Sequence, residues 1–150
     1  VDAFEAGMVI GSFGVGALGY TLVVKQLVAT LGPRRMAIIG ALFAGGALAL
    51  FAFGRDWRID CALFFIFGFS FLMLHNPLQA VATELSATAR GSSVALFALS
   101  LFLGQAVGPP IFGAASFLAG NLPMILAEAA IVASLGVLAA RFVLVDRKKT

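Results

Sequence analysis

The sequence predicts an all-α membrane protein, a polytopic bundle of about five transmembrane helices. Of its 150 residues, 61% are hydrophobic and only 11% are charged, whereas soluble domains carry about 25% charged residues. So few charged side chains cannot cover a soluble globule of this size, and the excess apolar surface must therefore face lipid. The mean hydropathy of +1.06 supports the same conclusion.

Apolar runs bounded by charges or turn residues mark the expected helices. Each run approaches or exceeds the roughly 20 residues that cross the hydrocarbon core of a bilayer. Helices are expected because a backbone in lipid must satisfy its own hydrogen bonds. The runs are residues 6–24, 36–54, 61–82, 94–119 and 124–145. Since the separators are short, we expect residues 1–150 to form one transmembrane domain.

Glycines in the first and fourth runs predict close helix packing, since small residues spaced by four let two backbones approach. The pairs are Gly7 with Gly11 and Gly104 with Gly108. Residues 14–19 also match the dinucleotide pattern GxGxxG, but no strand precedes them and no acidic residue follows at the required distance. A close-packed helix is the better interpretation of this stretch.

The fourth run contains a proline pair that predicts a kink or break in its helix. Gly108, Pro109 and Pro110 follow one another, and each proline removes a backbone donor and clashes with the preceding turn. In a membrane such a break survives only where protein or a wet cavity covers it.

The distribution of basic residues predicts the orientation of the chain. Cytoplasmic loops of membrane proteins are enriched in Lys and Arg. One predicted side carries Lys25, Arg34, Arg35, Arg90, Arg141, Arg147, Lys148 and Lys149, and the other carries Arg55 and Arg58. The chain is therefore expected to start outside and end in the cytoplasm. Because the basic residues form short clusters between apolar runs, no nucleic-acid partner is expected.

Polar side chains inside the spans are candidates for a substrate cavity, because such groups are costly in lipid. The candidates are Ser12, His75, Asn76, Gln79 and Gln105. For His75, a hydrogen bond to a neighbouring helix is an equally weighted alternative, whereas Gln105 favours the cavity because it lies beside the proline pair. Tyr20 is expected near the inner interface, and the 15 phenylalanines are interpreted as packing or lipid-facing groups.

Enzymatic and metal chemistry find little support in the sequence. The chain has one histidine and one cysteine, Cys61, and no acidic residue near the middle of a span to pair with them. A metal site needs more ligands than this. We expect no enzyme, no cofactor and no metal.

The stretch ATELSATARGSS at residues 82–93, followed by LGQAVGP at 103–109 and by Gly113, resembles the segment joining the tenth and eleventh helices of major facilitator superfamily transporters. The likeness is to the drug and sugar efflux branch. LGPRR at residues 31–35 is similar to the basic loop between the family's eighth and ninth helices, and Arg34 and Arg35 match its end. Lys25 and Ala29 depart from that loop's motif, where a glycine and an aspartate would fall.

The resemblance implies that the chain is the C-terminal part, about helices eight to twelve, of a secondary transporter whose N-terminal helices are missing. It implies alternating access, in which two bundles rock around a site near the midplane, and export of a small molecule, usually in exchange for protons. The helices that contain the candidates would line the cavity, in the inner (plasma) membrane of a cell. The alternative is a small non-catalytic membrane subunit, and a membrane-embedded enzyme is the least favoured class.

Overall fold

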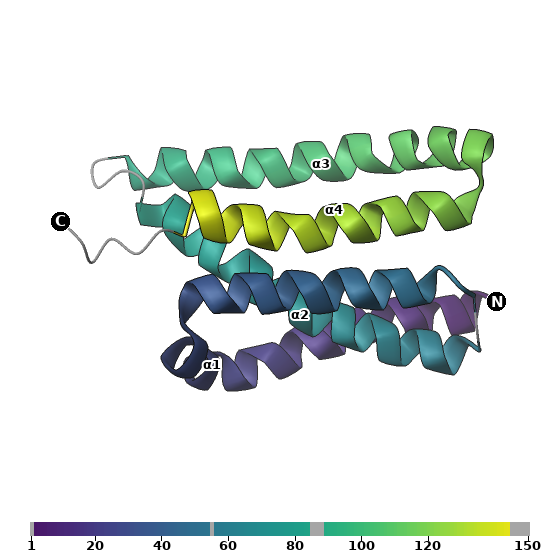
Figure 1. Cartoon of the computed structure of the whole chain (residues 1–150), viewed down its shortest axis with the longest axis horizontal. Coiled ribbons are helices and arrows are strands. Elements are labelled where there is room, and N and C mark those ends of the chain that lie inside the picture. The colour runs from purple at the N-terminus through teal and green to yellow at the C-terminus, as the bar shows by residue number, and fades with distance from the viewer. Residues whose placement is uncertain (1, 55, 85–88, 145–150) are drawn as a thin grey trace.

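The computed structural model describes residues 2–54, 56–84 and 89–144, and within them the chain is folded into helices without a strand. The elements are α1 (Ala3–Phe51), α2 (Trp57–Glu84), α3 (Arg90–Ala119) and α4 (Asn121–Phe142) (Figure 1). Each is long and apolar enough to cross a membrane. The predicted all-α membrane architecture is confirmed.

The first two predicted spans lie in the single element α1, which a non-helical residue divides in two, so the five predicted spans correspond to the two parts of α1 and to α2, α3 and α4. Gly32 divides α1 into two arms, residues 3–31 and 33–51, which run in opposite directions (Figure 1). Its backbone has φ 71° and ψ 164°, a conformation that only a residue without Cβ adopts readily. Pro33 can follow because a proline is tolerated at the start of a helix.

The separator predicted at residues 25–35 is therefore mostly helical. Nothing in residues 25–31 breaks the helix, and polar residues at a helix end can continue the helix beyond the hydrocarbon core. The same effect places the starts of α2, α3 and α4 at residues 57, 90 and 121, earlier than the apolar runs suggested. Asp2 begins α1 with a capping box, in which its carboxylate accepts from the Glu5 amide at 2.8 Å.

Close glycine contacts hold both arms of α1 against α2. A Cβ on Gly16 would collide with the backbone carbonyl of Phe65, and one on Gly68 with the carbonyl of Phe13. In the second arm, a Cβ on Gly40 would lie 2.6 Å from the Met73 Cβ. The missing side chains let these helices touch through their backbones.

The second arm of α1 packs on α4 in the same way. A Cβ on Gly45 would lie 2.6 Å from the Ala129 carbonyl oxygen, and Gly136 of α4 meets Ala41. The prediction that residues 14–19 pack closely is confirmed at Gly16. The pairs predicted at Gly7 with Gly11 and at Gly104 with Gly108 are wrong for this structure, because a Cβ on any of them would meet nothing within 4 Å.

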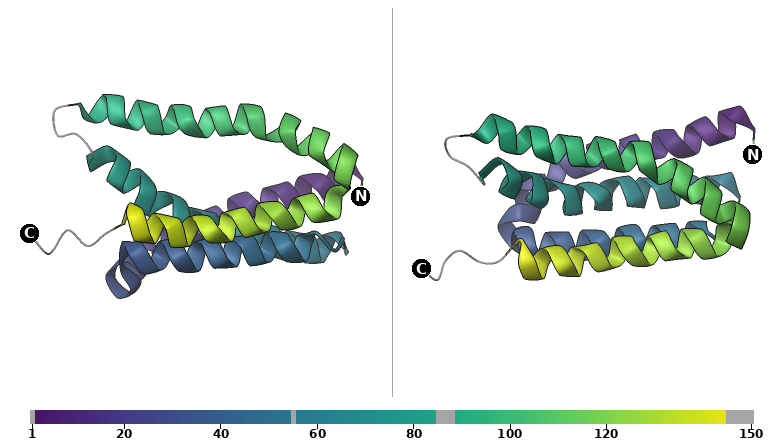
Figure 2. Two further views of the ribbon diagram at one scale, coloured as in Figure 1. Left: turned by 45° about the horizontal axis from the view of Figure 1, so that its top comes forward. Right: turned by 90° about the horizontal axis from the view of Figure 1, so that it is seen from above.

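Helix α3 lies at the edge of the bundle and is the least covered element (Figure 2). None of its residues is buried, whereas α1 and α2 share a core around Tyr20, Met36 and Met73. Leu118 and Phe117 near its end are 84% and 90% exposed. An apolar helix this exposed needs lipid or further protein around it.

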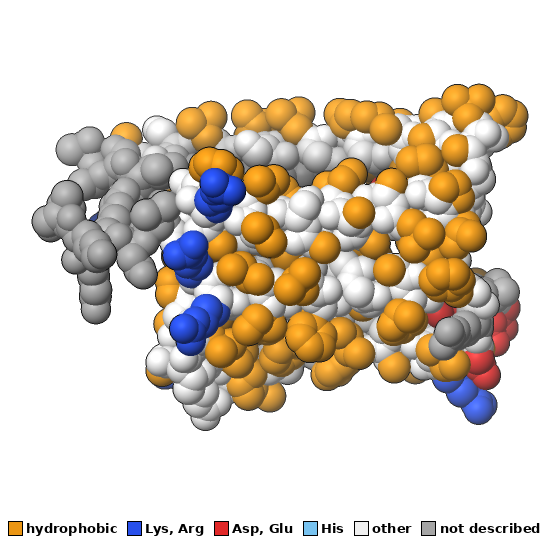
Figure 3. Space-filling view, viewed as in Figure 1, with side chains coloured by type: hydrophobic (Ala, Val, Ile, Leu, Met, Phe, Trp, Pro, Cys, Tyr) orange, Lys and Arg blue, Asp and Glu red, His pale blue; other side chains and the backbone are white. Residues whose placement is uncertain are grey.

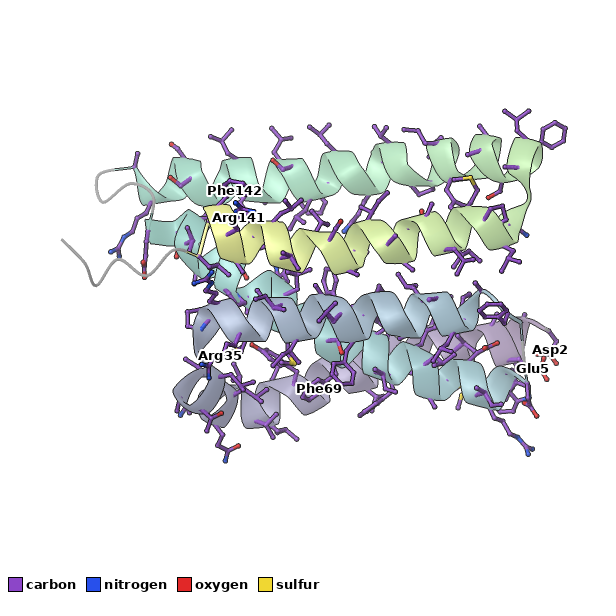
Figure 4. All side chains as sticks on the ribbon, in the orientation of Figure 1. Asp2, Glu5, Arg35, Phe69, Arg141 and Phe142 are labelled. Atoms are coloured by element: carbon purple, nitrogen blue, oxygen red, sulfur yellow. The ribbon has the colours of Figure 1, made fainter. Side chains whose placement is uncertain are left out.

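The surface is apolar along the helices and charged at their ends (Figure 3). Arg35 and Arg141 lie at one end of the bundle and Asp2 and Glu5 at the other (Figure 4). This pattern matches a body that sits in a bilayer with its charged ends in the two interfaces.

Candidate functional site

A column of rings follows one face of α2. We define the ring column as Phe64, Phe67, Phe71 and His75. Their spacing of three or four residues places them on one helix face. Successive centroids are 6.1, 6.2 and 5.5 Å apart, within the range of attractive aromatic pairs. The column extends for about 16 Å along the helix axis.

Three other rings contact the ring column from neighbouring segments. Phe13 of α1 lies 5.7 Å from Phe67 and 5.8 Å from Phe71. Phe51, at the end of α1, lies 4.9 Å from Phe64, and Phe97 of α3 lies 5.4 Å from His75. All these rings are partly exposed. The ring column therefore faces a region bounded by both arms of α1 and by α3.

The structure brings three of the predicted cavity residues together at the inner half of α2. His75 stacks on Phe71 with ring planes 15° apart, and Gln79 is close enough to interact with its imidazole. Asn76 is close to the Tyr20 hydroxyl, although that hydroxyl is buried and makes no hydrogen bond of acceptable geometry. His75 and Asn76 are partly buried and Gln79 is exposed.

Tyr20 belongs to the packed core of the bundle. It is fully buried and packs edge-on against Phe69 with centroids 5.8 Å apart, between the two arms of α1 and α2. The second arm of α1, which folds back at Gly32, covers it.

Ser12 and Gln105 lie apart from the His75 group. The Ser12 hydroxyl donates to the Met8 carbonyl at 2.8 Å, so its hydrogen bond is made within its own helix. Gln105 is exposed in the middle of α3. It is eight residues, about 12 Å, along α3 from Phe97, which contacts His75.

The proline pair does not break α3. The helix is continuous from Arg90 to Ala119 through Pro109 and Pro110, and its ribbon bends in its second half (Figure 2). Because prolines lack an amide hydrogen, the carbonyls of Gln105 and Ala106 lose their usual helical donors. The amide side chain of Gln105 and these two carbonyls together make a polar spot in the middle of an apolar helix.

Arg34 and Arg35 lie at the start of the second arm of α1 and are exposed. Figure 4 places Arg35 at the same end as Arg141. The predicted basic loop is therefore the exposed helical start of this arm, at one end of the bundle.

Asp60 is a buried acidic residue that sequence reasoning assigned to a separator. It is 7% exposed, and its Oδ1 is buried without a hydrogen-bond partner. It precedes Phe64 by four residues and therefore lies on the same helix face as the ring column. The sequence signal for this position was the four-residue spacing from Asp60 to Phe64, together with the short separator before Asp60.

Other chemistry finds no support in the described part of the chain. Residues 2–54, 56–84 and 89–144 contain no group of three or more His, Cys, Asp or Glu side chains that could hold a metal ion. Three grooves among the described helices are apolar, and none of the cavity candidates lines them.

Comparison with known proteins gives one match. The family model described as Major Facilitator Superfamily matches residues 1–150. No curated protein and no solved structure matches the chain.

Proposed function

The chain belongs to the major facilitator superfamily, and from this membership we propose that it is the C-terminal part of a secondary transporter that exports a small molecule. The family makes it a membrane transporter. Alternating access between two helical bundles is the mechanism we propose, with the N-terminal bundle as the partner of this chain. The proposal includes coupling to protons, for which we assign no carrier in this chain.

The polar spot in α3 is the main observation that supports a substrate cavity beside this helix. Gln105 and the freed carbonyls lie in the middle of an exposed helix, where contact with lipid would cost free energy. Water in a pathway would supply hydrogen bonds to these groups and leave the helix free to move. Lipid packed against this face would supply no hydrogen bonds.

The position of the ring column supports the same proposal. It lies on α2 and is touched by rings of α1 and α3, so three helices contribute to one partly exposed surface. Side chains that are only partly buried inside a bundle can contact a solute. We therefore propose that Gln105, His75, Asn76 and Gln79 lie along one pathway, with Ser12 near its outer side.

Replacing Gln105 tests this proposal. In the full-length transporter, Gln105→Leu should reduce the rate of export at least about fivefold, because a lost hydrogen bond to a solute costs about 1 kcal/mol or more. Export is measured in cells or proteoliposomes, and the amount of protein in the membrane by immunoblotting.

The matched control is Gln26→Leu, which removes an exposed amide on the first arm of α1, away from the proposed pathway. It should export at the normal rate. Normal export by the Gln105→Leu variant, at normal protein amounts, would remove Gln105 from the pathway.

A further inference from the structure

An apolar groove of about 440 Å³ lies between the two arms of α1 and α2, and we call it the α1–α2 groove. Each of the three segments contributes side chains spaced by four residues, so each presents one helix face to the groove. These side chains are Leu27 and Leu31 of the first arm, Ile39 and Phe43 of the second arm, and Phe65, Phe69 and Met73 of α2.

The α1–α2 groove lies on the side of α2 away from the ring column. At about 100° per residue, positions 65, 69 and 73 lie roughly 150° round the helix axis from positions 64, 67, 71 and 75. The groove therefore opens away from the proposed substrate pathway. Because the N-terminal bundle is proposed on the pathway side, lipid is left to cover the groove.

The walls of the groove reach the surface of the protein, whereas its floor is buried. Phe43 is 61% exposed and Phe65 is 41% exposed, but Met73 is only 5% exposed. Phe43 and Ile66 also line a second apolar groove, which continues along the second arm of α1 to Leu50. A hydrocarbon chain lying here would contact an apolar surface along its length.

Basic side chains lie at one end of the α1–α2 groove. Arg35 precedes Ile39 by four residues and Phe43 by eight, so all three lie on one face of the second arm. Arg34 and Lys25 are exposed beside the turn at Gly32, as is Arg35. Figure 4 shows Arg35 at the basic end of the bundle and Phe69 farther along it. No ion pair joins these three basic side chains to another described residue.

The length of the groove corresponds to one leaflet of a bilayer. From Arg35 to Phe43 the second arm of α1 rises about 12 Å, and half of the hydrocarbon core measures about 15 Å. The arginines would therefore lie at the level of the lipid headgroups while Phe43 lies near the ends of the acyl chains. The groove and its basic end thus have the polarity and the depth of a phospholipid.

We propose that the α1–α2 groove binds an anionic phospholipid from the leaflet at the basic end of the bundle. Arg35, together with Arg34, holds the phosphate, since a guanidinium can donate two parallel hydrogen bonds to phosphate oxygens. One acyl chain lies along Ile39, Phe43 and Phe69. This site is separate from the substrate pathway, and the inference does not depend on which solute is exported.

The test uses quenching of tryptophan fluorescence by lipids with brominated acyl chains. Phe43→Trp is introduced into the full-length transporter after its other tryptophans, including Trp57, are replaced by Phe. The protein is reconstituted in vesicles of dioleoylphosphatidylcholine that contain increasing fractions of brominated phosphatidylglycerol or brominated phosphatidylcholine. Half-maximal quenching should need at least about fivefold less of the anionic lipid, the preference that one basic residue near the surface provides.

The charged part of the site is tested in the same Phe43→Trp background. Arg35→Gln should remove most of the preference for phosphatidylglycerol, whereas Arg35→Lys, which keeps the charge, should retain part of it. The matched control is Arg141→Gln, which removes an exposed positive charge from the same end of the bundle but from α4. It should leave the preference unchanged.

A second reporter distinguishes the groove from ordinary lipid contact. Ile131 is 58% exposed on α4 and does not line the groove. In a tryptophan-free background, Ile131→Trp should be quenched by both brominated lipids to the same extent.

Three results would overturn the inference. Equal quenching of Phe43→Trp by the two lipids would mean that the groove contacts lipid without selecting its headgroup. Quenching by neither lipid would mean that another part of the transporter covers the groove. A preference for phosphatidylglycerol that survives replacement of both Arg34 and Arg35 by Gln would place the headgroup elsewhere. Since quenching requires no transport, these results are independent of the proposed export.

Discussion

Individual glycines determine where the helices of this protein touch through their backbones. Gly16 faces the Phe65 carbonyl so closely that no side chain fits between them. Gly46, on the second arm of α1, has open space around it. The same residue type is therefore essential at one position and replaceable at the other.

This difference predicts the effect of adding a side chain. Gly16→Val should destabilise the protein by about 1–3 kcal/mol, as overpacking of a filled contact does. Gly46→Val, which changes helix propensity in the same way, should change stability by less than about 0.5 kcal/mol. Thermal unfolding of the protein in detergent measures both. Equal losses of stability would contradict the contact at Gly16.

At this scale the sequence predicts the type of packing but not the partners. Spacing alone selected Gly7 and Gly104, which meet nothing, because it does not reveal which face another helix covers. Asp60 was overlooked for the same reason: its burial depends on segments distant in the chain. The expectation that His75 turns away from lipid rests on the cost of polar groups there, and its place in a cavity stays a prediction.

At the scale of elements, the helical spans were predictable because an apolar run in a membrane can satisfy its backbone only as a helix or a closed barrel. Their ends were less predictable, since interfacial water tolerates both helix and loop. Gly32 and Pro33 lie within the separator predicted at residues 25–35. Gly32 is the one non-helical residue of the turn, and Pro33 starts the second arm of α1, so there is little loop between the two arms.

The proline pair of α3 gives the prediction that belongs to this scale. Pro109→Ala restores an amide that can donate to the Gln105 carbonyl, which should stiffen α3 without weakening it. If bending of α3 is part of alternating access, turnover in proteoliposomes should fall while thermal stability stays equal or rises.

The control for that experiment is Pro123→Ala. Pro123 lies in the first turn of α4, where a missing amide costs little, so both turnover and stability should be unchanged. Normal turnover in Pro109→Ala would show that the bend has no part in transport.

At the scale of the whole molecule, the two ends differ in charge. Arg35 and Arg141 come from segments far apart in the chain and meet at one end, while Asp2 and Glu5 lie at the other (Figure 4). Because Lys and Arg favour the cytoplasmic side, we expect the basic end to face the cytoplasm. The acidic end, where Asp60 lies in the first turn of α2, then faces outward.

Cysteine labelling of the full-length transporter, freed of its other cysteines, tests this orientation directly; this chain contributes one cysteine, Cys61. In a Cys61→Ala background, Asp2→Cys should react with a membrane-impermeant maleimide added to intact cells. Arg35→Cys and Arg141→Cys should react only after the membrane is opened, and they should behave alike because they share one end. The opposite pattern would place the basic end outside, and the distribution of Lys and Arg would then not report the orientation of this chain.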